Sequence, residues 1–266
     1  MRQWRLIYDC PTPGVHNMAI DEALLTCCSG QPVLRLYAWE PFCLSLGYGQ
    51  RSADVDLERL AARGWDIVRR PSGGRAILHG DELTYSVILP AGHPLTAGGV
   101  IPSYRRLSQA LLAGLNRMGV APESNSRARR AESGPVCFEM PSHYEITVAG
   151  RKLVGSAQLR REAGVLQHGS LHLYGDIGRI CDVLRYPDEM AREAAQQLVR
   201  AHATTLQAAL DGAECRWQTV AEAIAAGFEE AFAVEFERTD LSQSERREAV
   251  RLAREVYSSP AWTFRR

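Results

Sequence analysis

Short hydrophobic blocks separated by turn-forming residues dominate the first 90 positions of the chain. Each block is rich in β-branched or aromatic side chains and is bounded by glycine, proline or polar residues, which is typical of β-strands. The strands predicted in this way are 4–8, 33–39, 43–47, 66–70 and 83–89.

Apolar residues at helical spacing lie between and after these strands. A segment rich in alanine, isoleucine and leucine runs from Asn17 to about Cys28, and residues 55–63 end at Gly64, a suitable C-cap. A longer amphipathic segment opens at Ser103 and closes at Gly119. Helices and strands therefore alternate within one core.

The second half of the chain begins with a hairpin pattern and then becomes helical. Residues 145–148 and 152–154 flank a turn at 149–151, and residues 165–173 resemble a further strand. Beyond Ile177 the pattern is helical almost to the end, with amphipathic stretches at 192–210, 217–232 and 242–257. The pattern leaves open whether these helices form a small subdomain or pack back on the sheet. We predict an α+β fold with a mixed β-sheet, flanking helices and a C-terminal helical segment.

Composition narrows the class of protein. The 266 residues include 31 basic and 31 acidic side chains, so the formal net charge is zero, and no run of about 18 apolar residues occurs. A nucleic-acid binder that relies on a domain-wide positive charge is disfavoured. Arg5 interrupts the start where a signal peptide would need an apolar stretch. We expect a cytoplasmic protein with no nucleic-acid or membrane partner.

Cysteine and lysine usage raises the first chemical question. Seven cysteines without a Cys-x-x-Cys pair argue against a disulfide framework or a structural zinc site, and most of these thiols should be core residues. Of the 31 basic residues, 30 are arginine and one is lysine, Lys152. An arginine-favouring genome would explain this bias. Alternatively, Lys152 is kept because an amine, unlike a guanidinium, can lose its proton.

Cys137 lies between Pro135 and Pro141, in a segment too punctuated for a long helix or a central strand. Lys152 follows fifteen positions later. A loop thiol and a nearby amine could form a nucleophile and base pair, although loop cysteines are commonly inert.

Two further segments carry candidate binding residues. RRPSGGR at 69–75 is followed by His79, and adjacent glycines let backbone N–H groups face an acyl oxygen or a phosphate, although a plain glycine turn is the alternative. It is not a P-loop, because the Gly-Lys-Ser/Thr ending is missing. His168 and His172 would share one face of a strand, where packing or hydrogen bonding is a commoner role than metal binding. We assign no metal.

The polar stretch 121–135 gathers Arg127, Arg129 and Arg130 in what should be an exposed loop. Such a cluster is either a solvated surface or a docking rim for an acidic partner.

Taken in order, four motifs resemble the catalytic domain of the biotin/lipoate protein ligase family: RRPSGGR at 69–75, LTYS at 83–86, KLVGSAQ at 152–158 and QHGS at 167–170. Within that family, VCF at 136–138, PS at 141–142 and YE at 144–145 resemble the octanoyltransferase branch often called LipM. The likeness extends from Trp4 to Trp262 and Arg266. One position departs from the pattern, since Gly80 intervenes between His79 and Asp81, and no role is assigned to Asp81.

The resemblance implies one catalytic domain over 1–266, with about 177–266 as its mainly helical portion. It implies transfer of an octanoyl group from octanoyl-acyl carrier protein to a lysine of a lipoyl domain, such as the glycine cleavage H protein, in lipoate biosynthesis. It makes Cys137 the acyl-accepting thiolate and Lys152 its proton partner, with Arg69, Arg70 and Arg151 as candidates for lowering the pKa of the amine. No metal or other cofactor is expected, because a thioester is already activated. The expected substrate-binding residues are Arg70, Ser72, Gly73, Gly74, His79, Gly155, Ser156, Ala157, His168 and Gly169.

Three alternatives remain open. An ATP-dependent lipoate or biotin ligase would form an adenylate with Mg²⁺ and needs no thiol, but Arg75 stands where many ligases have a third glycine. An amidotransferase that moves octanoyl between lipoyl domains differs only in its donor. A binding protein without turnover has no need of a lone lysine beside a candidate nucleophile.

Overall fold

Two β-sheets carry the fold in the computed structural model, which describes residues 2–28, 30–124 and 145–266. Within these residues the larger sheet has eight strands in the order β11-β1-β2-β6-β10-β9-β8-β7, and the smaller has three in the order β4-β3-β5. The strands of the larger sheet are Arg2–Tyr8 (β1), Val33–Tyr37 (β2), Glu82–Pro90 (β6), Glu123–Ser124 (β7), Ile146–Val148 (β8), Arg151–Arg161 (β9), Gly164–His172 (β10) and Val234–Arg238 (β11). Those of the smaller sheet are Cys43–Leu46 (β3), Asp66–Arg69 (β4) and Ile77–His79 (β5).

The larger sheet is mixed. β1 pairs in parallel with β2 and β11, whereas β2, β6, β10, β9 and β8 pair with one another in antiparallel order. The central strands β6 and β10 are buried along almost their whole length, because helices cover both faces of the sheet. The predicted mixed sheet with flanking helices is confirmed.

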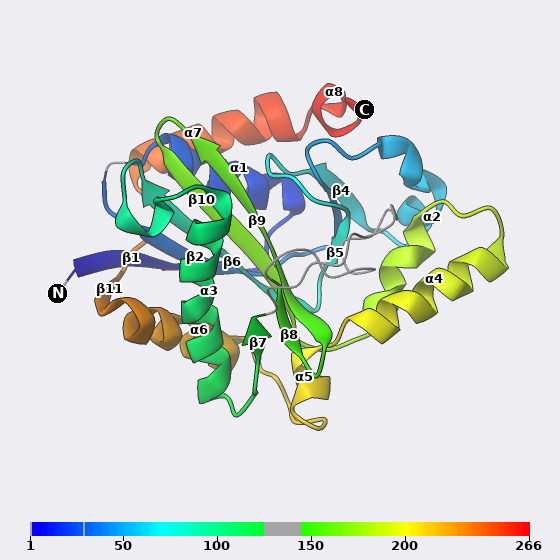
Figure 1. Cartoon of the computed structure of the whole chain (residues 1–266). Helices are drawn as coiled ribbons and strands as arrows, with labels where there is room; N and C mark the ends of the chain where they lie inside the picture. The colour runs from blue at the N-terminus through cyan, green and yellow to red at the C-terminus, as the bar shows by residue number, and fades with distance from the viewer. Residues whose placement is uncertain (1, 29, 125–144) are drawn as a thin grey trace.

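Helices on either face close the core. Val100–Arg117 (α3) and Trp217–Phe232 (α6) cover one face, and Gly14–Thr26 (α1) and Gln243–Leu252 (α7) lie along the other (Figure 1). α3 and α6 approach closely because both carry glycine at the crossing: a Cβ on Gly227 would lie 2.4 Å from the carbonyl oxygen of Ala110. The C-terminal helices therefore pack back on the sheets.

The smaller sheet has its own hydrophobic cluster. Its apolar side is covered by Leu57–Ala62 (α2), Ile177–Val183 (η3) and Glu189–His202 (α4). Its other side lies toward α1, so a space lined by both sheets can form. The remaining short turns and helices are Ser52–Asp54 (η1), Pro94–Thr96 (η2), Leu206–Ala209 (α5), Ala253–Tyr257 (η4) and Pro260–Thr263 (α8).

Several elements differ from the sequence prediction. The hairpin is present, since Ala149 and Gly150 have φ of 49° and 73°, but β9 continues to Arg161. The amphipathic stretch 192–210 is split into α4 and α5, because the N–H of Thr204 donates to the carbonyl of Lys152 instead of continuing a helix. β5, β7 and β11 were not predicted.

The described helices include none that is both long and apolar enough to cross a lipid bilayer.

Candidate active site

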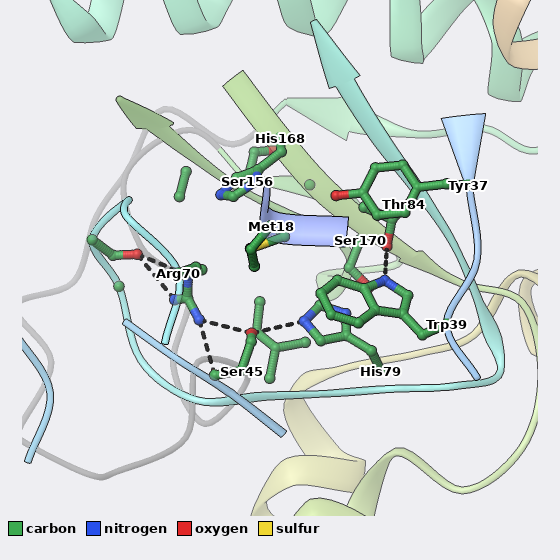
Figure 2. Close-up of a pocket in the computed structure, with 16 residues that line it drawn as sticks. Met18, Tyr37, Trp39, Ser45, Arg70, His79, Thr84, Ser156, His168 and Ser170 are labelled. Atoms are coloured by element: carbon green, nitrogen blue, oxygen red, sulfur yellow. Dashed lines mark hydrogen bonds between the residues drawn. The ribbon is translucent and has the colours of Figure 1, made fainter. Parts of the chain in front are cut away.

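A cavity opens between the two sheets, beside α1 (Figure 2). Nine of the ten predicted substrate-binding residues line it, and the tenth, Ser72, is hydrogen-bonded to one of them. The full lining is Met18, Tyr37, Trp39, Ser45, Arg70, Gly73, Gly74, Ile77, His79, Thr84, Gly155, Ser156, Ala157, His168, Gly169 and Ser170.

The glycine loop forms one wall and is held by a buried arginine. The guanidinium of Arg70 donates to the carbonyls of Ser45, Gly73 and Arg75, at 3.0, 2.9 and 2.6 Å. Gly74 has φ of +96°, in the left-handed region that favours glycine. Arg70 therefore contributes to the site mainly by shaping the loop.

Bare backbone on β9 and β10 forms the opposite wall. A Cβ on Gly169 would lie 2.6 Å from the carbonyl oxygen of Gly155, the Oγ of Ser156 and the ring of Tyr85. The pairing of Gly169 with Ser156 places these small residues side by side across the two strands. A side chain at position 169 would therefore force these neighbours apart and reshape this wall.

Ser45, His79 and Glu82 form a hydrogen-bonded chain along the cavity. His79 Nε2 lies 2.7 Å from Ser45 Oγ, and His79 Nδ1 lies 2.5 Å from Glu82 Oε1. The His79 ring stacks on Trp39, with ring centroids 3.9 Å apart and planes 10° apart (Figure 2). The imidazole is thus fixed on both edges and on one face.

Glu82 is the buried charge that organises this wall. Its carboxylate also accepts hydrogen bonds from Thr84 and Ser170. Burial alone would raise the pKa of Glu82, but the adjacent His79, together with the other hydrogen-bond donors, lowers it from 4.5 to about 2.

We expect Glu82→Gln to weaken the pH dependence of the free energy of unfolding on the acid side, which is called the acid limb here. The folded-state pKa of Glu82 is depressed, so its stabilisation is present above about pH 4.5 and is lost as pH falls toward 2; a shift of this size corresponds to about 3 kcal/mol. Urea unfolding at successively lower pH measures the limb, with the exposed Glu193→Gln as the control. An unchanged acid limb in Glu82→Gln would contradict this role.

A second chain joins α1 to β10. His168 Nε2 lies 2.5 Å from Ser72 Oγ, and His168 Nδ1 lies 3.1 Å from Asp21 Oδ2. The carboxylate of Asp21 also accepts from Arg35 and from Ser86, both at 2.8 Å. Burial opposes ionisation, yet the hydrogen bond from His168 and the charge of Arg35 lower the pKa of Asp21. His168 therefore has the hydrogen-bonding role that was the commoner expectation.

Lys152 lies on β9 outside the cavity lining and is 1% exposed. Its ammonium donates to the carboxylate of Glu145, which is also buried. Lys152 also lies within electrostatic reach of His172 on β10: burial first, and then the positive charges of His79 and Lys152, lower the pKa of His172 despite the opposing Glu82.

The three arginines expected to lower the pKa of Lys152 are engaged elsewhere or face solvent. Arg69 donates to backbone carbonyls including that of Gly47, and Arg70 holds the glycine loop. Arg151 is exposed. Asp81, to which no role was assigned, forms an ion pair with Arg179. A carboxylate rather than a guanidinium is the charged neighbour that the structure records beside the lysine.

Cys137 lies outside the described residues, as do Arg127, Arg129 and Arg130. None of the six described cysteines lines the cavity. Burial raises the pKa of the thiols of Cys27, Cys28, Cys43 and Cys215. These four thiols are therefore poor nucleophiles.

The described ranges also contain no group of three or more His, Cys, Asp and Glu side chains placed to hold a metal ion.

The predicted list of site residues omitted the residues that complete the cavity, although Thr84 and Ser170 lie within the LTYS and QHGS motifs. The omitted residues come from α1, from strands β2, β3, β5, β6 and β10, and from the segment after β2: Met18, Tyr37, Trp39, Ser45, Ile77, Thr84 and Ser170. One signal was available for the supporting network, because Asn17 and Asp21 are polar residues on the same helical face as the apolar Leu24 and Leu25.

Comparison with known proteins places this site in a family. Residues 13–229 match the family model of the lipoyl protein ligase A/B catalytic domain. The chain belongs to this family. Its membership confirms the resemblance predicted from the four sequence motifs.

Relatives of this chain include proteins named octanoyltransferase LipM, which align with it over essentially its whole length. The one from Kyrpidia tusciae is 41% identical and covers 100% of both chains. The one from Moorella thermoacetica is 42% identical and covers 99% of this chain and 98% of its own.

Solved structures share the family fold. A bi-partite lipoate protein ligase from Thermoplasma acidophilum superposes with a TM-score of 0.82 and 23% identity, covering 99% of this chain and 97% of its own. A lipoate-protein ligase A bound with ATP gives 0.81 and 21% identity, with 98% of both chains covered. At these identities the likeness concerns the fold, and it confirms the predicted α+β class.

Proposed function

We propose that the protein is an octanoyltransferase of lipoate biosynthesis, which moves an octanoyl group to a lysine of a lipoyl domain. The observation that carries the proposal is full-length identity of about 40% to proteins named octanoyltransferase LipM, combined with a cavity between the sheets where the motif residues meet. The proposed donor is octanoyl-acyl carrier protein, and a proposed acceptor is the glycine cleavage H protein. The proposal includes a cytoplasmic location.

The cavity suits a saturated chain with one polar end. Met18, Tyr37, Trp39 and Ile77 supply apolar surface, while the glycine backbones leave room (Figure 2). Burying a fatty chain yields about 0.8 kcal/mol per CH₂, so filling the cavity with the correct length is worth several kcal/mol. This energy would select the acyl group.

The proposed chemistry proceeds through an acyl-enzyme. The thiolate of Cys137 attacks the donor thioester, and the leaving thiolate takes a proton from the Lys152 ammonium. The acceptor amine then attacks the new thioester and passes a proton to neutral Lys152, and the Cys137 thiolate leaves. The balance is one thioester exchanged for one amide, with the thiolate and ammonium restored. No nucleotide or metal is required in this scheme.

Intact mass spectrometry tests the proposal. The full chain is incubated with octanoyl-acyl carrier protein, and we expect one octanoyl adduct that hydroxylamine removes. Cys137→Ser should abolish the adduct, whereas Cys10→Ser, at an exposed cysteine, should leave it unchanged.

Each other outcome identifies a rival. Transfer to an acceptor only with ATP would replace the proposal with a ligase. Labelling by octanoylated H protein alone would indicate an amidotransferase, and no labelling by either donor would favour a binding role. An adduct that survives Cys137→Ser would show that another nucleophile is used.

A further inference from the structure

The only lysine of the chain is buried against a carboxylate. The Nζ of Lys152 donates to Oε1 of Glu145, and the two side chains are 1% and 4% exposed. A buried ammonium without a compensating charge is strongly disfavoured relative to the neutral amine. The protonation state of Lys152 therefore depends on Glu145.

The backbone around the Lys152–Glu145 contact is held by the β8–β9 hairpin on one side of β9 and by Thr204 on the other. Glu145 immediately precedes β8, and Lys152 lies opposite Thr147 on β9, with a register shift between Ile146 and Thr147. The carbonyl of Lys152 accepts the N–H of Thr204 at 2.9 Å, which holds the strand from its other side. The lysine backbone is thus restrained independently of its side-chain partner.

A titratable side chain on β10 also lies near the ammonium, and a carboxylate on β6 lies beside that side chain. His172 lies within electrostatic reach of Lys152, and His172 Nδ1 lies 3.9 Å from Glu82 Oε2. The carboxylate of Glu82 is already engaged by His79, Thr84 and Ser170. Glu145 is the carboxylate in direct contact with Lys152 among the described residues.

We propose that Glu145 is a positioning residue that keeps Lys152 as an ammonium in the resting enzyme and holds it for proton exchange. This inference rests on the proposed function in assigning Lys152 a catalytic task. In the proposed reaction the ammonium gives its proton to the thiolate that leaves the donor. The amine formed then takes a proton from the acceptor lysine, which restores the ammonium.

The single lysine makes this inference directly measurable. Protein labelled with ¹³C at the lysine ε-carbon gives one side-chain signal, from Lys152, whose chemical shift reports protonation. Glu145→Gln removes the charge at nearly constant volume, so the titration midpoint should fall by more than about one pH unit. Glu145→Asp should restore most of the wild-type midpoint.

A matched control is available at another buried ion pair. Glu245 is 4% exposed and pairs with Arg5 at 2.6 Å, between α7 and β1. Glu245→Gln therefore imposes a comparable loss of a buried carboxylate and should leave the Lys152 signal unchanged. An unchanged midpoint in Glu145→Gln would overturn the inference, as would an equal shift in Glu245→Gln.

Kinetics provide the second readout. In Glu145→Gln, the alkaline limb of the pH profile of kcat/KM for acylation should move to lower pH, with a loss of about 10-fold near pH 7 that Glu145→Asp rescues. A uniform loss at every pH would indicate a merely structural role and contradict the inference. If Glu145→Gln does not fold, the smaller Glu145→Ala, which also removes the carboxylate, decides the matter: a midpoint below the wild-type value supports the inference, and an unchanged midpoint contradicts it.

The two proposals fail in different ways. If the wild type forms no acyl-enzyme, the proposed function falls. The lysine titration still tests whether Glu145 sets the protonation of Lys152, because it needs no substrate.

Discussion

Replacing Lys152 with arginine should reduce octanoyl transfer by at least about 10²-fold, the usual scale of a lost general acid–base group. Arginine keeps the positive charge and can pair with Glu145, but its guanidinium does not release a proton at accessible pH. The variant therefore separates charge from proton exchange at a site where the side chain is 1% exposed. The measurement is the single-turnover rate of transfer to an acceptor lipoyl domain.

Two further variants distinguish loss of proton exchange from other effects of the substitution. The adjacent, exposed Arg151→Lys makes the reverse exchange one residue away and should be near wild type. Lys152→Met removes the charge at similar volume, so a loss confined to Lys152→Arg would point to overpacking by the larger guanidinium. Normal turnover in Lys152→Arg would remove the proton-exchange role.

Gly47→Ala should be the most damaging single-methyl change around the cavity. A Cβ at position 47 would lie 1.9 Å from the carbonyl oxygen of Gly74, an impossible contact between backbone segments. The loop of Gly73 and Gly74 would have to move, and a displacement of about 1 Å at a site of this kind can cost about 10²-fold in rate. Overpacking should also destabilise the fold by about 1–3 kcal/mol.

The control lies two residues away on the same loop. A Cβ on Gly49 meets nothing within 4 Å, so Gly49→Ala should change neither stability nor activity appreciably. Acylation is measured well below the unfolding temperature of each variant, which separates loop displacement from unfolding. Equal rates in the two alanine variants would show that the Gly47 contact does not shape the site.

Local sequence predicted those parts of the molecule that are encoded locally. The alternating and apolar blocks predicted the strands at 4–8 and 83–89, and the turn at Ala149 and Gly150 predicted the hairpin, because each depends on neighbouring residues alone. The strand Val234–Arg238 was missed, although Val-Glu-Phe-Glu alternates as an edge strand does.

The cavity walls could be predicted only in part. Adjacent glycines such as Gly73 and Gly74 indicate that the backbone can approach a ligand closely, so the residues of that loop were expected at the site. Trp39 and Ser45 come from segments whose lateral neighbours depend on the order of strands in two sheets, which no local pattern records. Roles in catalysis remain predictions for Cys137 and Lys152.

The pairing of Lys152 with Glu145 was within reach of sequence reasoning. The predicted hairpin brings position 145 near position 152, and a buried amine needs an opposite charge. The sequence-based prediction instead gave arginines as the charged neighbours of Lys152.

The burial of the solitary lysine has a consequence for self-modification. An enzyme that builds amides on lysine side chains also exposes its own surface to every activated acyl group that it binds. Here the remaining 30 basic side chains are guanidinium groups, which are too weakly nucleophilic at neutral pH to compete, and the one primary amine among the side chains is shielded from solvent. The chain therefore offers no accessible lysine of its own as a substrate, and the acyl group is reserved for the lysine that the acceptor domain presents.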